Sequence, residues 1–157
     1  MDSTTPSHTA PLDLLKSLSG LEFLQRIIDG RLPQALMAQT LRFAAIEVEV
    51  GKVMFEGIPG LEHYNPIGTV HGGYACTLLD SAMSCAVQSM CAAGMAYTTL
   101  ELKVNLVRPI TTETGPVRAE GSVIHVGRRT GTAEGKLLDA SGKLLAHGTT
   151  TCLIFPL

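Results

Sequence analysis

The strongest periodic pattern of apolar positions in the chain lies within residues 65–90. This stretch opens on a turn signal, Asn65-Pro66, and passes through His71 and two glycines into a long apolar segment. The apolar side chains then recur at spacings of three and four, which predicts a helix. They are Tyr74, Ala75, Leu78, Leu79, Ala82, Met83, Ala86, Val87 and Met90, with Cys76 and Cys85 on the remaining circumference. Because apolar residues surround nearly the whole helix, we expect it to be buried.

One polar strip interrupts this helix. Asp80 is the only acidic or basic side chain between His71 and Glu101. A lone carboxylate on an apolar helix is costly unless it is paired or lies in a solvated cleft. The pattern therefore indicates a functional role for Asp80. The polar strip consists of Thr77, Asp80, Ser81, Ser84 and Gln88.

Most of the remaining chain favours strands. Leu100, Leu102, Val104 and Leu106 alternate with polar residues, which predicts a half-buried strand over 97–107. Five or six strands beside a single long apolar helix predict an α+β fold, with an antiparallel sheet wrapped around that helix. The other predicted elements are strands at 41–50, 52–57, 117–126, 132–139 and 144–155, one or two short amphipathic helices within 13–29, and a connector over 31–40.

The length of 157 residues suits one domain, which we place at residues 13–157 after a disordered N-terminal tail over 1–12. A net charge of −2 gives no support to binding of nucleic acid or of an anionic membrane. No apolar run approaches the roughly 20 residues of a transmembrane helix. The N-terminus lacks the basic and apolar regions of a secretory signal. We expect a cytoplasmic protein.

The cysteines and histidines give no metal-binding pattern. The chain has four cysteines and no C-x-x-C pair, so we interpret them as reduced, buried apolar side chains. A metal site from His63, His71 and Asp80 would lack any standard short spacing. We therefore predict no metal.

The start of the helix and several downstream segments resemble a known family pattern. They resemble the hotdog-fold acyl-CoA thioesterases of the phenylacetic-acid-degradation type, over about residues 20–155. The resemblance implies an acyl-CoA substrate, no cofactor, and a homodimer joined edge to edge, assembled as a homotetramer, with active sites at the subunit interface. The matching segments are Asn65, Gly68, His71-Gly72-Gly73, Leu79-Asp80, Leu100–Asn105, Arg108-Pro109, the GRRT turn at 127–130 and AHGTTT at 146–151.

Two residues carry the expected chemistry. Gly72 lies where the helix begins, so its backbone N–H is an unsatisfied donor at the positive end of the helix dipole. Its lack of a side chain would let a carbonyl approach closely, although a tight turn alone would also explain it. The resemblance implies that Gly72 polarises the thioester carbonyl. It also implies that Asp80 is the nucleophile or general base toward a thioester bound by the partner subunit. A structural, hydrogen-bonded role for Asp80 is the alternative.

Three further residues are assigned by the resemblance. Asn65 would hold the carbonyl or the attacking water, although Asn before Pro is also an ordinary turn former. His71 would orient the loop before the helix by hydrogen bonding. Thr99 would bind the water or the acid, with Thr98 as the competing choice, because a one-residue register slip exchanges their faces.

The coenzyme A moiety requires cations and turn amides. Arg128 and Arg129 supply cations in a turn, and the resemblance places nucleotide contacts there, with Thr130 beside them. A solvated loop would explain the two arginines equally well, and Arg108 is a weaker candidate. The competing function is a non-catalytic acyl-CoA binding module of the same fold. The residues fit aryl-acyl and medium-chain acyl groups equally.

Overall fold

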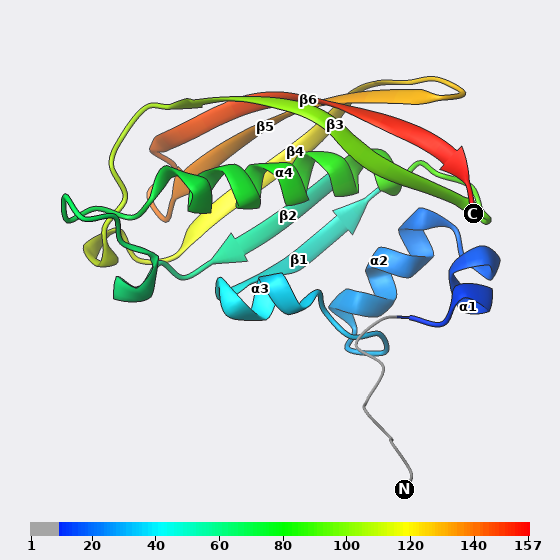
Figure 1. The fold of residues 1–157 in the computed structure, drawn as a ribbon, viewed down its shortest axis with the longest axis horizontal. Helices are drawn as coiled ribbons and strands as arrows, with labels where there is room; N and C mark the ends of the chain where they lie inside the picture. The colour runs from blue at the N-terminus through cyan, green and yellow to red at the C-terminus, as the bar shows by residue number, and fades with distance from the viewer. Residues whose placement is uncertain (1–9) are drawn as a thin grey trace, which may run out of the picture.

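A curved antiparallel sheet packs over one long helix in the computed structural model, which describes residues 10–157 (Figure 1). The six strands follow the order β1-β2-β4-β5-β6-β3, and all neighbours are antiparallel. The predicted α+β fold is confirmed. The helices are α1 (Leu12–Ser17), α2 (Gly20–Ile28), α3 (Leu36–Thr40) and α4 (Gly72–Gln88), with 3₁₀ turns at Leu61–His63 and Thr112–Thr114. The strands are β1 (Phe43–Glu49), β2 (Lys52–Gly57), β3 (Met95–Leu106), β4 (Val117–Val126), β5 (Thr130–Asp139) and β6 (Leu144–Pro156).

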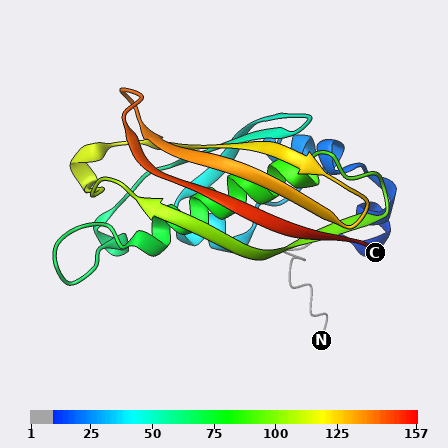
Figure 2. The ribbon, with the colours of Figure 1, turned by 90° about the horizontal axis from the view of Figure 1, so that it is seen from above.

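Helix α4 is the centre of the core, as its periodicity predicts. Seen from above, the sheet lies across the length of the helix (Figure 2). Leu78, Leu79 and Met83 have no exposed surface. Burial of such side chains contributes about 1.5–3 kcal/mol each, so the apolar faces of α4 fix its position against the sheet.

Glycines on the strands allow the sheet to approach α4 closely. A Cβ on Gly121 of β4 would lie 2.2 Å from the carbonyl oxygen of Ala82. A Cβ on Gly131 of β5 would lie 2.5 Å from Val87. A side chain at either position would push the helix away, so these glycines set the depth at which α4 lies.

Strand β3 differs from its predicted half-buried pattern. Leu100, Leu102 and Leu106 have exposed fractions of 57%, 36% and 56%, while Val104 is half-buried. The register against β6 shifts between Thr99 and Glu101, because a bulge interrupts the alternation. Within residues 10–157, β3 is also an edge strand whose only neighbour is β6. The leucines therefore lie on an uncovered sheet edge.

The N-terminal segment covers the face of α4 that carries the polar strip. The predicted helical region divides at Ser19, which caps α2 in a capping box with Glu22. Gly20 packs directly on α4, since a Cβ there would lie 1.7 Å from the carbonyl oxygen of Gln88. The connector predicted over 31–40 contains the one-turn helix α3. The predicted tail falls mostly on residues 1–9, outside the described residues, and α1 begins at Leu12.

Candidate active site

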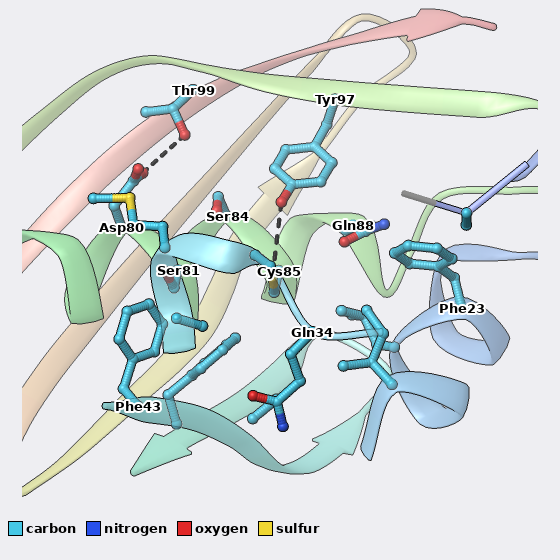
Figure 3. Close-up of a pocket in the computed structure, with 18 of the residues that line it drawn as sticks. Phe23, Gln34, Phe43, Asp80, Ser81, Ser84, Cys85, Gln88, Tyr97 and Thr99 are labelled. Atoms are coloured by element: carbon cyan, nitrogen blue, oxygen red, sulfur yellow. Dashed lines mark hydrogen bonds between the residues drawn. The ribbon is translucent and has the colours of Figure 1, made fainter. Parts of the chain in front are cut away.

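A cavity of about 690 Å³ lies between α4 and the N-terminal helices (Figure 3). Its wall is largely apolar and contains several aromatic side chains, although the chain as a whole has few. Phe23, Phe43 and Phe55 line it, which is three of the four phenylalanines in the sequence. The polar strip of α4 faces this cavity with Asp80, Ser81, Ser84 and Gln88. A volume of several hundred Å³ with few polar groups is typical of a small-molecule pocket.

Asp80 is held at one end of the cavity by a threonine. The Thr99 hydroxyl donates a hydrogen bond of 2.8 Å to Oδ1 of Asp80. Thr99 pairs with the buried Cys152 on β6, which turns its side chain toward the helix, whereas Thr98 makes no such bond. Asp80 is the only charged side chain among the described residues that line the cavity. Its second carboxylate oxygen is left for a ligand or water.

The other ionisable groups around the cavity remain neutral. Burial raises the pKa of the Cys85 thiol to about 12. Burial also raises the pKa of Tyr97 well above its usual range, and its hydroxyl contacts the sulfur of Cys85 at 3.7 Å. Because a thiol attacks as the thiolate, Cys85 is a poor nucleophile here. Asp80 is left as the reactive group.

The start of α4 presents an unpaired backbone donor. Nδ1 of His71 accepts a hydrogen bond of 2.9 Å from the Gly73 N–H, and the His71 carbonyl accepts one from Tyr74. The Gly72 N–H has no hydrogen-bond partner within residues 10–157. The N-cap thus satisfies the amides on the C-terminal side of Gly72 and leaves that of Gly72 itself available. A Cβ on Gly72 would meet Leu106 of β3 at 2.5 Å.

Asn65 organises the turn before the helix. Its Oδ1 accepts hydrogen bonds from the Ile67 and Thr69 amides, and its Nδ2 donates one to the Thr69 hydroxyl. The turn-forming role of this residue is therefore present. Asn65, His71 and Gly72 also line a second cavity, of about 280 Å³. One Nδ2 proton of Asn65 has no partner among the described residues.

The predicted catalytic residues fall into two groups within one chain. Asp80 and Thr99 line the larger cavity, whereas Asn65, His71 and Gly72 line the smaller one. Gly72 and Asp80 are eight residues apart on a rigid helix, a distance of roughly 12 Å along its axis. No carbonyl can touch both groups of the same chain.

The arginine turn lies apart from both groups. Arg128, Arg129 and Thr130 are exposed at the junction of β4 and β5. The next residue, Gly131, packs against Val87, which places the turn at the C-terminal end of α4 (Figure 1). The structure therefore does not bring this turn together with Gly72.

Two absences apply to the described part of the chain. No cluster of three or more His, Cys, Asp or Glu side chains within residues 10–157 could hold a metal ion. No helix in the same range is both long and apolar enough to cross a membrane.

The sequence does not predict that Phe23, Gln34 and Tyr97 meet in the wall of the larger cavity. Phe23 and Gln34 reach it from α2 and the following loop, and Tyr97 reaches it from β3. Tyr97 is distant in sequence from the other two, and Gln34 lies in a segment without a pattern, so only the tertiary fold shows that they meet. The amphipathic pattern of α2 does predict that Phe23 faces the protein.

A six-stranded antiparallel sheet wrapped around a central helix, with a half-buried carboxylate midway along that helix, defines the hotdog fold in its thioesterase form. The chain belongs to the Thioesterase superfamily, which it matches over residues 67–146, about half of its length.

Known relatives agree with this placement. The chain is similar to the structure of a candidate thioesterase of Ralstonia eutropha JMP134, a phenylacetic acid degradation-related protein. The TM-score is 0.76 with 27% identity, over 83% of this chain and 98% of that one. A mutant of the phenylacetic acid degradation protein PaaI from Thermus thermophilus gives a TM-score of 0.68 and 26% identity, over 76% and 98% of the two chains. A candidate esterase of Halobacterium salinarum is 41% identical over 69 residues, which are 43% of this chain and only 44% of that protein.

Proposed function

We propose that the protein is an acyl-CoA thioesterase that hydrolyses aryl- or medium-chain acyl-CoA to the free acid and CoA, in the cytoplasm. The observation that carries the proposal is the Asp80 carboxylate. Asp80 is the only charged side chain among the described residues that line this apolar cavity. Thr99 fixes one of its carboxylate oxygens by a hydrogen bond, and the other oxygen is available. A module that only binds an acyl chain gains nothing from a carboxylate in its apolar wall, since covering a charge with an apolar ligand is costly.

The complete site requires two subunits. The free edge of β3 and its exposed leucines suit pairing with the same strand of a second copy. Antiparallel pairing about a two-fold axis sets the two central helices side by side in opposite directions. The start of one helix then lies near the middle of the other, so Asp80 of one subunit works with the partner subunit's Gly72. A homodimer of this kind, further assembled as a homotetramer, is the proposed form.

In this arrangement each residue has a distinct task. The Gly72 N–H donates to the thioester oxygen as negative charge develops there, a contribution of about 3 kcal/mol for one such donor. His71 holds the start of the helix in place through the Gly73 amide. Asn65 contributes its remaining Nδ2 proton to the carbonyl or the attacking water. Arg128, Arg129 and Thr130, at the β4–β5 turn, bind the phosphate groups of CoA.

The reaction can follow two routes, and both consume one water molecule and release the free acid and CoA. If Asp80 attacks the carbonyl carbon, a mixed anhydride forms and CoA leaves as the thiolate, which takes up a proton. Water then hydrolyses the anhydride and restores the carboxylate. If Asp80 acts as a general base, it removes a proton from a water held near Thr99, and that water attacks the carbonyl.

The test is thiol release from a panel of acyl-CoAs by the wild type, Asp80→Asn and Asp80→Ala. We expect kcat to fall about 10³-fold or more in both variants. Glu134→Gln is the matched control, because Glu134 is exposed on β5 away from the cavity. Full activity of Asp80→Asn would show that the carboxylate is not the reacting group. Tight binding of acyl-CoA without turnover by the wild type would instead identify a binding module.

A further inference from the structure

A buried histidine, His63, lies outside the two cavities of the candidate site, in the 3₁₀ turn that precedes α4. Its side chain is 3% exposed. Nδ1 accepts a hydrogen bond of 3.0 Å from the Gly60 amide, so the neutral ring carries its hydrogen on Nε2. In the part of the chain that the structure describes, two buried side-chain atoms have no hydrogen-bond partner, Nε2 of His63 and the hydroxyl of Tyr74. Because such groups are costly, an apolar ring would suit a purely structural position better.

His63 is joined to the chain on both sides of Gly72. Its carbonyl accepts a hydrogen bond of 2.8 Å from the amide of His71, which directly precedes Gly72. Its ring stacks on that of Tyr74, with centroids 4.6 Å apart and planes at 29°. Tyr74 is the third residue of α4 and is itself buried. One residue therefore fixes the start of α4, through its backbone before Gly72 and through its ring after Gly72.

An ion pair beside His63 sets the state of its ring. Oε1 of Glu62 accepts a hydrogen bond of 3.1 Å from Arg42 and lies 3.9 Å from Nε2 of His63. A carboxylate on this side favours the tautomer with its hydrogen on Nε2, which leaves Nδ1 to accept from Gly60. Arg42 has a φ of +55°, a left-handed conformation that is costly for residues other than glycine. Glycine would relieve that cost but would lose the ion pair.

The Gly72 amide depends on this support, because within residues 10–157 it has no hydrogen bond of its own. A donor to a developing oxyanion must lie about 2.7–3.1 Å from it, and a displacement of about 1 Å costs roughly a hundredfold in rate. We propose that His63 is a positioning residue, which fixes the start of α4 so that the Gly72 N–H meets the thioester oxygen in the transition state. Glu62 and Arg42 act through His63. This inference rests on the proposed function.

The experiment measures kcat and KM for acyl-CoA hydrolysis well below the melting temperature of each variant. His63→Phe keeps a stacking ring and removes the acceptor for Gly60, so kcat should fall about 10- to 100-fold while KM stays within about threefold. His63→Asn keeps an acceptor near the position of Nδ1 and should recover part of the loss. His147→Phe is the matched control, because His147 is exposed on β6 and lines neither cavity. A lower Tm with unchanged kcat per folded active site would show a merely structural histidine and overturn the proposal.

A double-mutant cycle tests the role of Glu62. Glu62→Met removes the carboxylate and should lower kcat about threefold in the wild-type background. The same change should have no further effect in the His63→Phe background, since its route passes through the imidazole. Equal effects in both backgrounds would overturn the assignment of Glu62.

Hydrogen exchange separates this inference from the proposed function, because it needs no turnover. The amides of Gly73 and Tyr74 donate to Nδ1 and to the carbonyl of His71, respectively. Both should exchange about tenfold faster in His63→Phe, as the start of α4 loosens. Faster exchange in a protein that hydrolyses no acyl-CoA supports the anchorage by His63 and rejects the thioesterase. Wild-type turnover, with unchanged exchange and kcat in His63→Phe, rejects the inference and retains the thioesterase.

Discussion

Replacement of Gly121 by alanine tests whether the close contact of sheet and helix holds the site together. The new Cβ would lie 2.2 Å from the carbonyl oxygen of Ala82 and 2.7 Å from the amide nitrogen of Met83. Both atoms belong to the backbone of α4, so no side chain can rotate out of the way. The helix would have to move by about 1 Å to restore ordinary contact distances.

The magnitude follows from the cost of overpacking a core. Extra atoms in a well-packed interior cost about 1–3 kcal/mol, and a clash with helix backbone belongs at the upper end. For a chain of this size each kcal/mol lowers Tm by roughly 2–4 °C, so we expect Gly121→Ala to melt about 6–12 °C below the wild type. The shift also moves Asp80, which lies one turn from Met83, away from Thr99. Thioester hydrolysis should therefore fall in the protein that remains folded.

The assay is thermal unfolding followed by circular dichroism, with all proteins at one concentration because association changes Tm. Gly127→Ala is the control. A Cβ on Gly127 would meet its nearest atoms, on His125 and Thr130, at 3.4 and 3.6 Å, which are ordinary contacts. This control should melt within about 2 °C of the wild type. If Gly121→Ala also melts within that range, the glycine does not set the depth of α4.

Two more predictions concern the larger cavity. Thr99→Val keeps the shape of the side chain and removes its hydrogen bond to Asp80, which is worth about 1.5–3 kcal/mol for a charged acceptor, so kcat should fall by about 10- to 100-fold. Thr99→Ser should retain most activity in the same thiol-release assay, and equal rates for valine and serine would exclude the hydrogen bond as the cause. The pKa of Cys85, raised to about 12 by burial, predicts a pH effect on stability. The thiol ionises at lower pH in the unfolded chain than in the folded one, so its contribution is complete below about pH 8.5 and is lost as pH rises toward about 12, by at most ~1.4 kcal/mol per pH unit. Urea unfolding from pH 8 to pH 11 should show a shallower loss for Cys85→Ala than for the wild type, and parallel curves would refute the assignment.

The central helix was predictable because its information is local. Spacings of three and four over residues 74–90 have only one regular interpretation, and the cost of an isolated charge on an apolar helix singles out Asp80. The cap formed by His71 follows from its place just before the helix. The presence of the strands was predictable for a similar reason, because the alternation of apolar and polar residues and the turn residues that bound it lie close together in sequence.

The structural details that the sequence did not predict depend on contacts between segments that are distant in sequence. The alternating leucines of 100–106 predict a half-buried strand, but no local pattern shows that β3 lies at the sheet edge or that a bulge follows Thr99. The choice between Thr98 and Thr99 depends on that same register. Helix α3 is a single turn, too short for a period to appear.

The cavity itself could not have been predicted. Phe23 and Gln34 reach the cavity because α2 packs on β1 and, through Gly20, against the backbone of Gln88. The division of the candidate residues into two cavities likewise follows from the rigid length of α4. A sequence pattern places Gly72 and Asp80 on one helix but does not show which neighbours each one faces.

The contact of Gly20 with Gln88 has a consequence for how this protein can diversify. The stretch that matches the superfamily, residues 67–146, holds Asp80, Thr99 and the start of α4, whereas Phe23, Gln34 and Phe43 all precede it. The reactive residues and one part of the cavity wall are thus encoded in separate parts of the gene. An exchange of the N-terminal helices, which pack on β1 and α4, offers a route to new selectivity while the hydrolytic apparatus is inherited unchanged.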